Sequence, residues 1–250
     1  MVAIHSTHRI VEELRARRFS LVHAAEIPLP ERLAQAWEDL RADYAHLPPD
    51  EFLPGGARYR FRRYDRFYFH PYTGELAILP HEDYFQSREI NAVTGGIVRR
   101  FAPLTPEIAD NPFLHELIRF DFSAFPLVQA EMQYNPWQVD VHLIQIVADL
   151  GAEGHPTPEG VHRDGAEFVT VHLVNLENAE GGVVTVYDDD RQPLASFQLK
   201  QALDSYLFED ALLWHGVTPI RSADGINPAR RGILTFDFHY SPNLPHPYEI

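Results

Sequence analysis

The sequence predicts a mainly β fold with flanking helices, built as a sandwich or a barrel. Short apolar runs follow one another in the second half of the chain, with glycine, aspartate and proline between them, which is typical of strands joined by turns. No helix-length pattern separates these runs, so a parallel sheet with crossover helices is not expected. The predicted strands cover residues 139–147, 168–176, 183–187, 194–199, 205–208 and 233–240.

Helices are expected in the first half of the chain. Within residues 1–50, apolar side chains recur at three- and four-residue spacing over 10–17 and 30–47, and Pro48-Pro49 ends the second pattern. A further helical region spans residues 104–133, with one helix from Pro106 to His115 and another from Leu117 to Phe125.

Residues 59–69 combine arginine with tyrosine and phenylalanine. Such a strip can form a stacking surface for nucleic acid. The strong net negative charge of the chain instead favours strand residues packed around the mouth of a pocket. After this strand, Pro71–Gly74 is typical of a hairpin turn, and the acidic run Asp188–Asp190 is expected to be the solvated tip of another hairpin.

Composition excludes several classes of function. The chain has 250 residues, no cysteine, and 36 acidic against 21 basic side chains, a net charge of −15. Without cysteine there are no disulfides, thiolate metal sites or cysteine nucleophiles. The negative charge disfavours nucleic acid and anionic membranes as partners. No apolar run is long enough for a membrane span or a signal peptide, so we expect a cytoplasmic protein of a single domain.

The 14 histidines direct attention to metal sites built from imidazole and carboxylate. A His-x-Asp pair can supply two ligands, because residues i and i+2 at a strand end point to the same side. The pattern occurs at His81-Glu82-Asp83 and at His162-Arg163-Asp164. We interpret His81 as an ordinary surface or loop histidine. Glycines bracket His162 and Asp164 and a strong strand follows them, so this pair is the candidate site.

A third ligand and an anion-binding residue are predicted from later strands. His215 ends the apolar run 212–214, and four predicted strands between Asp164 and His215 can carry the chain round a barrel and back. Two neighbouring arginines, Arg230 and Arg231, open the final strand, where a guanidinium can bind a carboxylate through two parallel hydrogen bonds. Because adjacent strand residues face opposite sides, only one of them can point inward.

Taken with these motifs, residues 55–240 resemble the Fe(II)/2-oxoglutarate-dependent dioxygenases, and in particular the bacterial hydroxylases of free aliphatic L-amino acids typified by isoleucine dioxygenases. The resemblance is carried by the sequences PEGVHRDG at 158–165, YFQS at 84–87 and NAVTGGIVR at 91–99. It implies a mixed substrate-side segment over 55–130 and a double-stranded β-helix (jelly-roll) core over 130–240. Together with the helical part expected over 1–50, these segments are predicted to form a single dioxygenase domain over 1–250.

The resemblance also implies a reaction and its residues. Iron is expected on His162, Asp164 and His215, the C5 carboxylate of the co-substrate 2-oxoglutarate on Arg231, and O2 at the open side of the metal. The reaction is hydroxylation of a free amino acid, isoleucine or leucine first with methionine sulfoxidation as a side activity, and it releases succinate and CO2. Gln145 departs from the branch, which often carries arginine near this position.

A free amino acid also needs polar partners for its ammonium and carboxylate groups. The segment 84–99 offers two amides, Gln86 and Asn91, and one cation, Arg99. Two alternatives stay open on sequence: hydroxylation of a peptide or another small metabolite, and a cupin-like barrel that binds metal without turnover. His142 and His172 fall within predicted strands and are expected to be structural core histidines. The sequence does not fix the oligomeric state.

Overall fold

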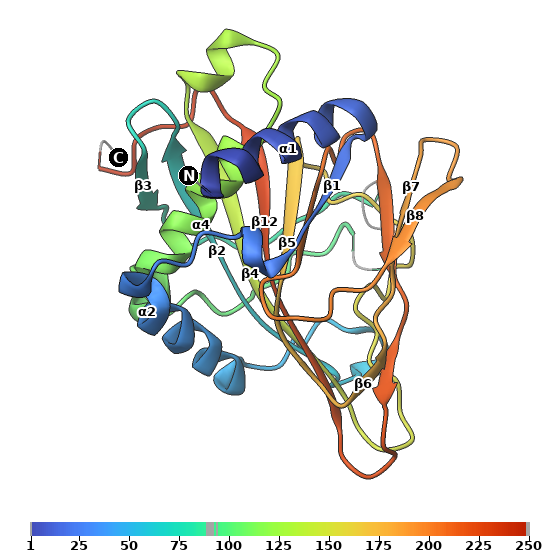
Figure 1. Cartoon of the computed structure of the whole chain (residues 1–250). Helices are drawn as coiled ribbons and strands as arrows, with labels where there is room; N and C mark the ends of the chain where they lie inside the picture. Colours follow the sequence, from blue (N-terminus) through green and yellow to red (C-terminus); the bar gives the residue numbers. More distant parts are fainter. Residues whose placement is uncertain (1, 89–92, 94, 249–250) are drawn as a thin grey trace.

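A computed structural model describes residues 2–88, 93 and 95–248 and shows a β core flanked by helices (Figure 1). The helices are α1 (Val2–Arg17), α2 (Glu31–Ala42), α3 (Pro106–Ala109) and α4 (Pro112–Ser123), with short 3-10 turns at Ala24–Glu26, Asp43–His46, Pro54–Gly56 and Ala130–Gln133. The strands are β1 (Phe19–Val22), β2 (Arg60–His70), β3 (Glu75–Ile78), β4 (Trp137–Ala148), β5 (Phe168–Glu177), β6 (Ala179–Gly181), β7 (Val184–Tyr187), β8 (Pro193–Phe197), β9 (Ser205–Phe208), β10 (Trp214–Val217), β11 (Ile220–Ser222) and β12 (Ala229–Tyr240).

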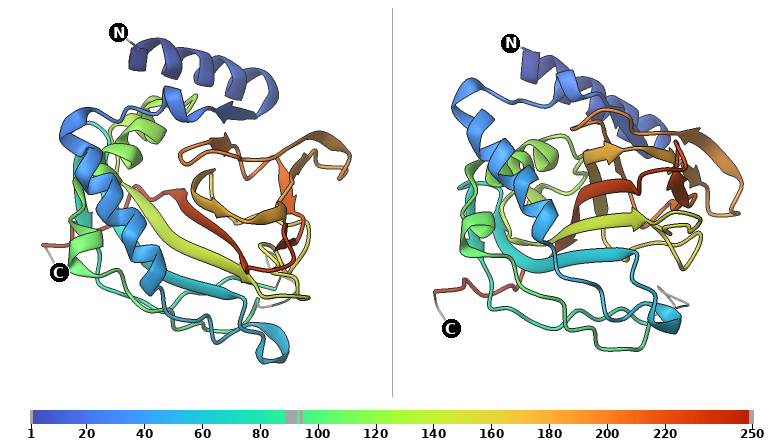
Figure 2. Two further views of the ribbon diagram at one scale, coloured as in Figure 1. Left: turned by 60° about the horizontal axis from the view of Figure 1, so that its bottom comes forward. Right: turned by 90° about the horizontal axis from the view of Figure 1, so that it is seen from below.

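The strands form two facing layers of a jelly roll, the double-stranded β-helix that the resemblance implied. The larger layer is a seven-stranded sheet in the order β1-β9-β5-β12-β4-β2-β3, and the smaller layer contains the sheets β10-β7-β8 and β11-β6. Neighbouring strands within these sheets run antiparallel, as the sequence predicted. In Figure 2 the N-terminal helices and the strands of the smaller layer lie on opposite sides of the large sheet.

Alternation along the central strands decides which side chains enter the jelly roll. In β12, Leu234, Phe236 and Phe238 are buried in the core formed with the helices. Residues of the opposite parity, from Arg231 through Thr235 to Asp237, line a cavity between the two layers. The same period of two therefore builds both the hydrophobic core and the wall of the cavity.

The back of β12 is buttressed by the turn that follows α2. The Tyr44 hydroxyl donates to the Ile233 carbonyl oxygen at 2.8 Å. A Cβ atom added to Gly232 would lie 2.8 Å from Tyr44 Cδ1 and 2.9 Å from Asn175 Nδ2, so only glycine allows this approach. Between Gly232 and Ile233 the pairing with β5 shifts register from Asn175 to Leu173. Tyr44 thus packs at an irregularity in the sheet, next to Arg231.

A buried polar network ties α4 to the sheet. His172 is fully buried; its Nδ1 is 2.7 Å from Ser205 Oγ and its Nε2 is 2.8 Å from Asp121 Oδ2. The same Asp121 oxygen accepts from the Thr170 hydroxyl at 2.7 Å. Serine, histidine and aspartate in this order resemble a nucleophilic triad, but none of the three is accessible. The expectation that His172 is structural is confirmed.

The structure corrects several predicted boundaries. The expected helix 106–115 is two helices, because Asn111 accepts from the backbone N–H groups of Phe113 and Leu114 and so begins α4 anew. Residues 1–50, expected to be helical, contain the strand β1, whose pairing partner β9 lies far along the chain. Five strands, not four, separate Asp164 from His215, since the short β6 has no apolar run to reveal it. Among the described residues, no helix combines the length and apolar character that a membrane crossing requires.

Candidate metal centre and ligand cavity

Two histidines that are far apart in sequence are held together by the backbone. His162, in the loop before β5, and His215, in β10, form an isolated antiparallel bridge in which each N–H donates to the other's carbonyl oxygen at 2.9 Å. Their ring centroids lie 4.3 Å apart. The bridge therefore fixes the spacing of the two imidazoles independently of any ligand.

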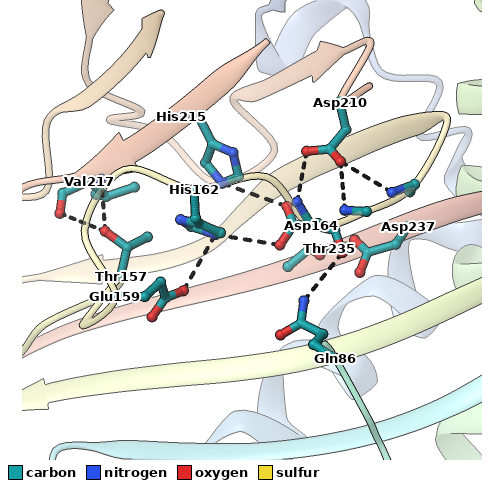
Figure 3. Close-up of polar contacts among 12 residues, drawn as sticks. Gln86, Thr157, Glu159, His162, Asp164, Asp210, His215, Val217, Thr235 and Asp237 are labelled. Carbon is teal, nitrogen blue, oxygen red and sulfur yellow. Dashed lines mark hydrogen bonds and ion pairs between the residues drawn. The ribbon is translucent and has the colours of Figure 1, made fainter. Parts of the chain in front are cut away.

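Asp164 completes the group that the sequence predicted. Its Oδ1 is 3.4 Å from His162 Nε2, and its Oδ2 is 3.7 Å from His215 Nε2 (Figure 3). One ligand atom from each of the three residues lies within 4.8 Å of the others. Both histidines are buried and Asp164 is partly buried. Two imidazoles and one carboxylate converging in this way fit the donor set of a non-haem Fe(II) centre.

The orientation of the His162 ring is fixed by a backbone carbonyl. His162 Nδ1 is 3.0 Å from the Gly160 carbonyl oxygen, which can only accept, so Nδ1 carries a proton. Nε2 is then the nitrogen left for a metal. Nε2 also lies 3.4 Å from Oε1 of Glu159, which projects from the same loop.

A second aspartate holds the loop that carries Asp164. Asp210 accepts the backbone N–H of Asp164 at 2.8 Å, of Gly165 at 2.7 Å and of Ala166 at 3.1 Å (Figure 3). Burial and the nearby Asp164 charge raise the pKa of Asp210 to about 7. Its role is one of positioning, because these bonds reach the backbone of the loop and not the metal-binding atoms.

Electrostatics within the group favour an ionised carboxylate. Burial alone would raise the pKa of Asp164, but the two histidines outweigh it and lower that pKa below the ordinary range. Burial opposes a proton on His162, yet the hydrogen bond to Asp164 and the Asp164 charge raise the His162 pKa to about 10. Burial and the His162 charge lower the pKa of His215 to about 3. Without metal, the site thus holds one imidazolium, one neutral imidazole and one carboxylate.

Arg230 and Arg231 point to opposite faces of β12, as expected for adjacent residues of a strand. Arg231 is 1% exposed and lines the cavity, whereas Arg230 is exposed on the other face of β12. Both terminal nitrogens of Arg231 are buried without a hydrogen-bond partner in the described structure. A buried guanidinium with free N–H donors can bind a carboxylate that enters the cavity, such as that of 2-oxoglutarate.

Two of the three expected substrate-binding residues, Gln86 and Arg99, line the cavity. Arg99 Nη2 donates to Gln86 Oε1 at 2.7 Å, and Gln86 Nε2 donates to the Asp164 carbonyl oxygen at 3.2 Å. Both side chains are buried and line the cavity that contains the metal group. Asn91 lies outside the described residues.

Sequence reasoning missed several residues of the cavity wall. Besides the expected residues, the lining includes Arg60, Arg62, Tyr84, His142, Glu159, Tyr206 and Asp237. Arg60 and Arg62 belong to the arginine–aromatic strip, whose interpretation as strand residues around a pocket is confirmed by β2. Their alternation with Phe61 was the signal that could have placed them inside.

The expectation for His142 is confirmed only in part. It is buried, stacks on Tyr64 at 4.7 Å between ring centroids, and accepts from Arg62 through Nδ1 at 2.6 Å, as a core histidine would. Its Nε2 is 3.2 Å from Asp237 Oδ2. However, His142 also lines the cavity.

The remaining polar candidates lie elsewhere. His81 is in a loop and contacts Asp65 Oδ1 at 2.7 Å, which confirms that it is an ordinary loop histidine. Gln145 lies on the face of β4 opposite His142 and Ile144, where its side-chain oxygen accepts from Asn175 at 3.0 Å. Gln145 is therefore not part of the cavity wall.

Comparison with known proteins identifies the family. The family model described as 2OG-Fe dioxygenase matches residues 41–237. This chain belongs to the 2OG-Fe dioxygenase family. As a 2OG-Fe dioxygenase, it is an enzyme that uses Fe(II), 2-oxoglutarate and O2.

Individual relatives extend over most of this 2OG-Fe dioxygenase. The L-isoleucine-4-hydroxylase of Bacillus thuringiensis is 27% identical over 199 residues, which cover 79% of this chain and 80% of the relative. The 3(1)-hydroxy-L-isoleucine 4-dioxygenase of Pantoea ananatis (strain AJ13355) is 27% identical over 203 residues, 80% of each chain. The crystal structure of a bsmA homolog from Methylobium petroleophilum PM1 superposes with a TM-score of 0.82 at 29% identity, covering 94% of this chain and 95% of that one.

Proposed function

We propose that this dioxygenase hydroxylates a free aliphatic L-amino acid, isoleucine or leucine first, with sulfoxidation of methionine as a side activity. In this proposal Fe(II) binds to His162, Asp164 and His215, and Arg231 holds the C5 carboxylate of 2-oxoglutarate. With Fe(II) bound there, O2 would serve as the oxidant: one of its oxygen atoms would enter succinate as 2-oxoglutarate loses CO2, and the other would convert a C–H bond of the substrate to C–OH.

The observation that carries this proposal is the composition of one cavity. The metal group and the unpaired Arg231 guanidinium share it with Gln86 and Arg99. Val169, Val171 and Ile233 contribute apolar wall between these polar groups. Polar groups at fixed places in an otherwise apolar cavity suit a small ligand with charged ends and an aliphatic body. The activities named for the B. thuringiensis and P. ananatis relatives support the same substrate class.

Each polar residue then has a binding task. Arg99 and Gln86 hold the carboxylate end of the amino acid, and Asn91, outside the described residues, is proposed to assist them. The hydrogen bond from Gln86 to the Asp164 backbone ties this end to the loop of the metal centre at 3.2 Å. Substrate and metal are thereby positioned by one connected set of residues.

The decisive experiment measures succinate release with Fe(II) and 2-oxoglutarate against a panel of the twenty free amino acids. We expect stimulation above the uncoupled background by isoleucine or leucine and little by charged amino acids. Arg99→Ala should weaken binding of the amino acid about tenfold or more and leave binding of 2-oxoglutarate unchanged, because the two carboxylates have separate guanidinium partners. Stimulation by a peptide or another metabolite, and by no free amino acid, would reject the substrate class but retain the dioxygenase.

A further inference from the structure

Glu159 is a cavity residue to which the proposed function gives no task. It precedes Gly160 in the loop between β4 and β5, lines the cavity, and has a side chain only 12% exposed. Among the described residues, its one close polar contact is Nε2 of His162, at 3.4 Å. Glu159 is not part of the three-residue group that converges on the metal position.

This contact cannot persist once a metal is bound. His162 Nδ1 keeps its proton for the Gly160 carbonyl oxygen, at 3.0 Å, so the metal must take the lone pair of Nε2. Nε2 then has no proton to share with Glu159. Within the part of the chain that the structure describes, the loaded site therefore leaves Glu159 as a largely buried carboxylate without a hydrogen-bond donor, an arrangement that is costly unless a cation enters the cavity.

The same cavity also contains positive charges that no acidic side chain pairs with among the described residues. Arg60 is paired with Asp50 at 2.7 Å, but among the described residues Arg62 and Arg99 form no ion pair. The Arg62 guanidinium lies 3.9 Å from the centre of the Phe101 ring, and that of Arg99 lies 4.7 Å from the centre of the Tyr84 ring. The Nε of each is buried without a partner. Aromatic faces hold both cations in place, together with the neutral His142 ring for Arg62 and the Gln86 amide for Arg99, and none of these groups neutralises their charge.

Outside the metal group, the cavity lining contains one carboxylate besides Glu159, that of Asp237, and it already has hydrogen-bond donors. Asp237 accepts from Thr235 Oγ1 at 3.3 Å and lies 3.2 Å from His142 Nε2, so it has donors that Glu159 lacks. Glu159 is also near enough to Arg99 for the two charges to interact electrostatically. With Arg231 assigned to 2-oxoglutarate, the described residues of the cavity leave one unmatched anion, Glu159, and two unmatched cations, Arg62 and Arg99. This set complements a zwitterion whose charges are a few ångströms apart.

We propose that Glu159 binds the α-ammonium group of the substrate, opposite Arg62 and Arg99, which receive its carboxylate, so that the enzyme requires an uncapped amino group. This inference rests on the proposed function, since it names the residue that recognises one end of the proposed amino acid. It restricts the substrate class further, because N-acylated amino acids and residues inside a peptide lack this cation.

The test uses two ligands that differ only in the ammonium group, L-isoleucine and 3-methylpentanoic acid. Their dissociation constants are measured anaerobically on the protein loaded with Fe(II) and 2-oxoglutarate, whose visible charge-transfer band also reports the state of the metal. Glu159→Gln is compared with wild type. Glu153→Gln, a matched change at an exposed glutamate of the same loop, is the control.

We expect Glu159→Gln to raise the dissociation constant of L-isoleucine by about tenfold to a hundredfold, as for loss of a hydrogen bond between charged groups. The dissociation constant of 3-methylpentanoic acid should change less than about twofold. The charge-transfer band should be unchanged, and Glu153→Gln should behave as wild type.

Three outcomes would overturn the inference. Equal binding of isoleucine by wild type and Glu159→Gln, or equal weakening of both ligands, would show that Glu159 does not recognise the ammonium. Loss of the band in Glu159→Gln would place this carboxylate at the metal instead. If wild type itself binds no amino acid, the proposed function fails and takes this inference with it, a result that the wild-type measurement alone distinguishes.

Discussion

His162 and His215 face each other across one antiparallel bridge, each donating its N–H to the other's carbonyl oxygen at 2.9 Å. The two rings are thus spaced by peptide hydrogen bonds and not by the ion they are proposed to hold. The apolar core that supports β5 and β10 is likewise built without any metal. The metal-free protein is therefore expected to be folded, with its ligands already in place.

The first prediction concerns the metal ligands. His162→Ala should abolish iron binding and iron-dependent turnover while the jelly roll stays folded, because the imidazole supplies a metal bond and little of the core. Bound iron after gel filtration and the near-ultraviolet circular dichroism spectrum check the two halves of this expectation. His81→Ala is the control, since that ring is occupied by Asp65. Iron lost from the His81 variant and kept by the His162 variant would contradict the assignment.

A second prediction follows from the protonation of the site. The pKa of His162 is raised to about 10, so at neutral pH its Nε2 carries a proton that Fe(II) must displace, whereas the His215 pKa of about 3 leaves that ring already neutral. Below the pKa of His162, binding of one iron should release about one proton, and affinity should rise about tenfold per pH unit between pH 6 and 8.

Calorimetry in buffers of different ionisation enthalpy counts these protons. The sign is set by the raised pKa: protons compete with the metal at low pH, and the competition ends as the pH approaches 10. Release of no proton, or an affinity that does not vary with pH, would show that His162 does not carry a proton before the metal binds.

The third prediction concerns Asp210. Asp210→Asn exchanges one acceptor oxygen for an NH2 group that faces backbone N–H donors, so the loop of Asp164 should loosen and iron affinity should fall about 10- to 100-fold. Asp204 is a matched control, because it also accepts three backbone N–H groups but lies outside the cavity lining. Asp204→Asn should lower thermal stability without changing iron affinity. An equal effect of both changes on iron would refute the positioning role.

The fourth prediction separates the two adjacent arginines. Arg231→Ala should raise the KM for 2-oxoglutarate at least tenfold, and Arg231→Lys should restore only part of the affinity because an ammonium cannot form two parallel hydrogen bonds. Arg230→Ala should be silent, since that side chain is exposed on the other face of β12. Damage by Arg230→Ala alone would mean that the co-substrate is held elsewhere.

The fifth prediction concerns stability away from the site. Asp121→Ala leaves the buried His172 and Thr170 without their common acceptor, at a cost of about 3 kcal/mol in the free energy of unfolding. For a chain of this size that corresponds to roughly 10 °C in Tm, measurable by scanning calorimetry. Glu116→Ala, at a half-exposed position of the same helix where only ion pairs with accessible arginines are lost, should shift Tm little. A shift below 2 °C for Asp121→Ala would show that the network is not stabilising.

The parts of the site that could be predicted depend on local pattern. His162 and Asp164 stand two residues apart beside glycine, and His215 ends an apolar run, so short segments sufficed to select them. The direction in which Arg231 points could also be predicted from the sequence. Leu234, Phe236 and Phe238 alternate along β12 and face the core, so residues at the odd positions, including Arg231, face the cavity.

The remaining residues depend on strand pairing that no local pattern contains. Arg62 meets His142 only because β2 pairs with β4, and Glu159 is one of many acidic residues until its loop is folded against β10. The strand β1 was missed for the same reason: four residues gain their β structure from pairing with β9, far along the chain.

The contact between Tyr44 and Gly232 bears on any attempt to trim this enzyme. Among the described side chains, those of the N-terminal helices do not line the cavity, so these helices would be the first part removed in designing a minimal catalytic barrel. Yet Tyr44 bonds to the backbone of Ile233 and fills the space over Gly232, where the sheet changes register beside Arg231. A shortened barrel would lose this brace beside Arg231, the residue proposed to hold 2-oxoglutarate, so we expect removal of the N-terminal helices and the turn that carries Tyr44 to weaken binding of the co-substrate.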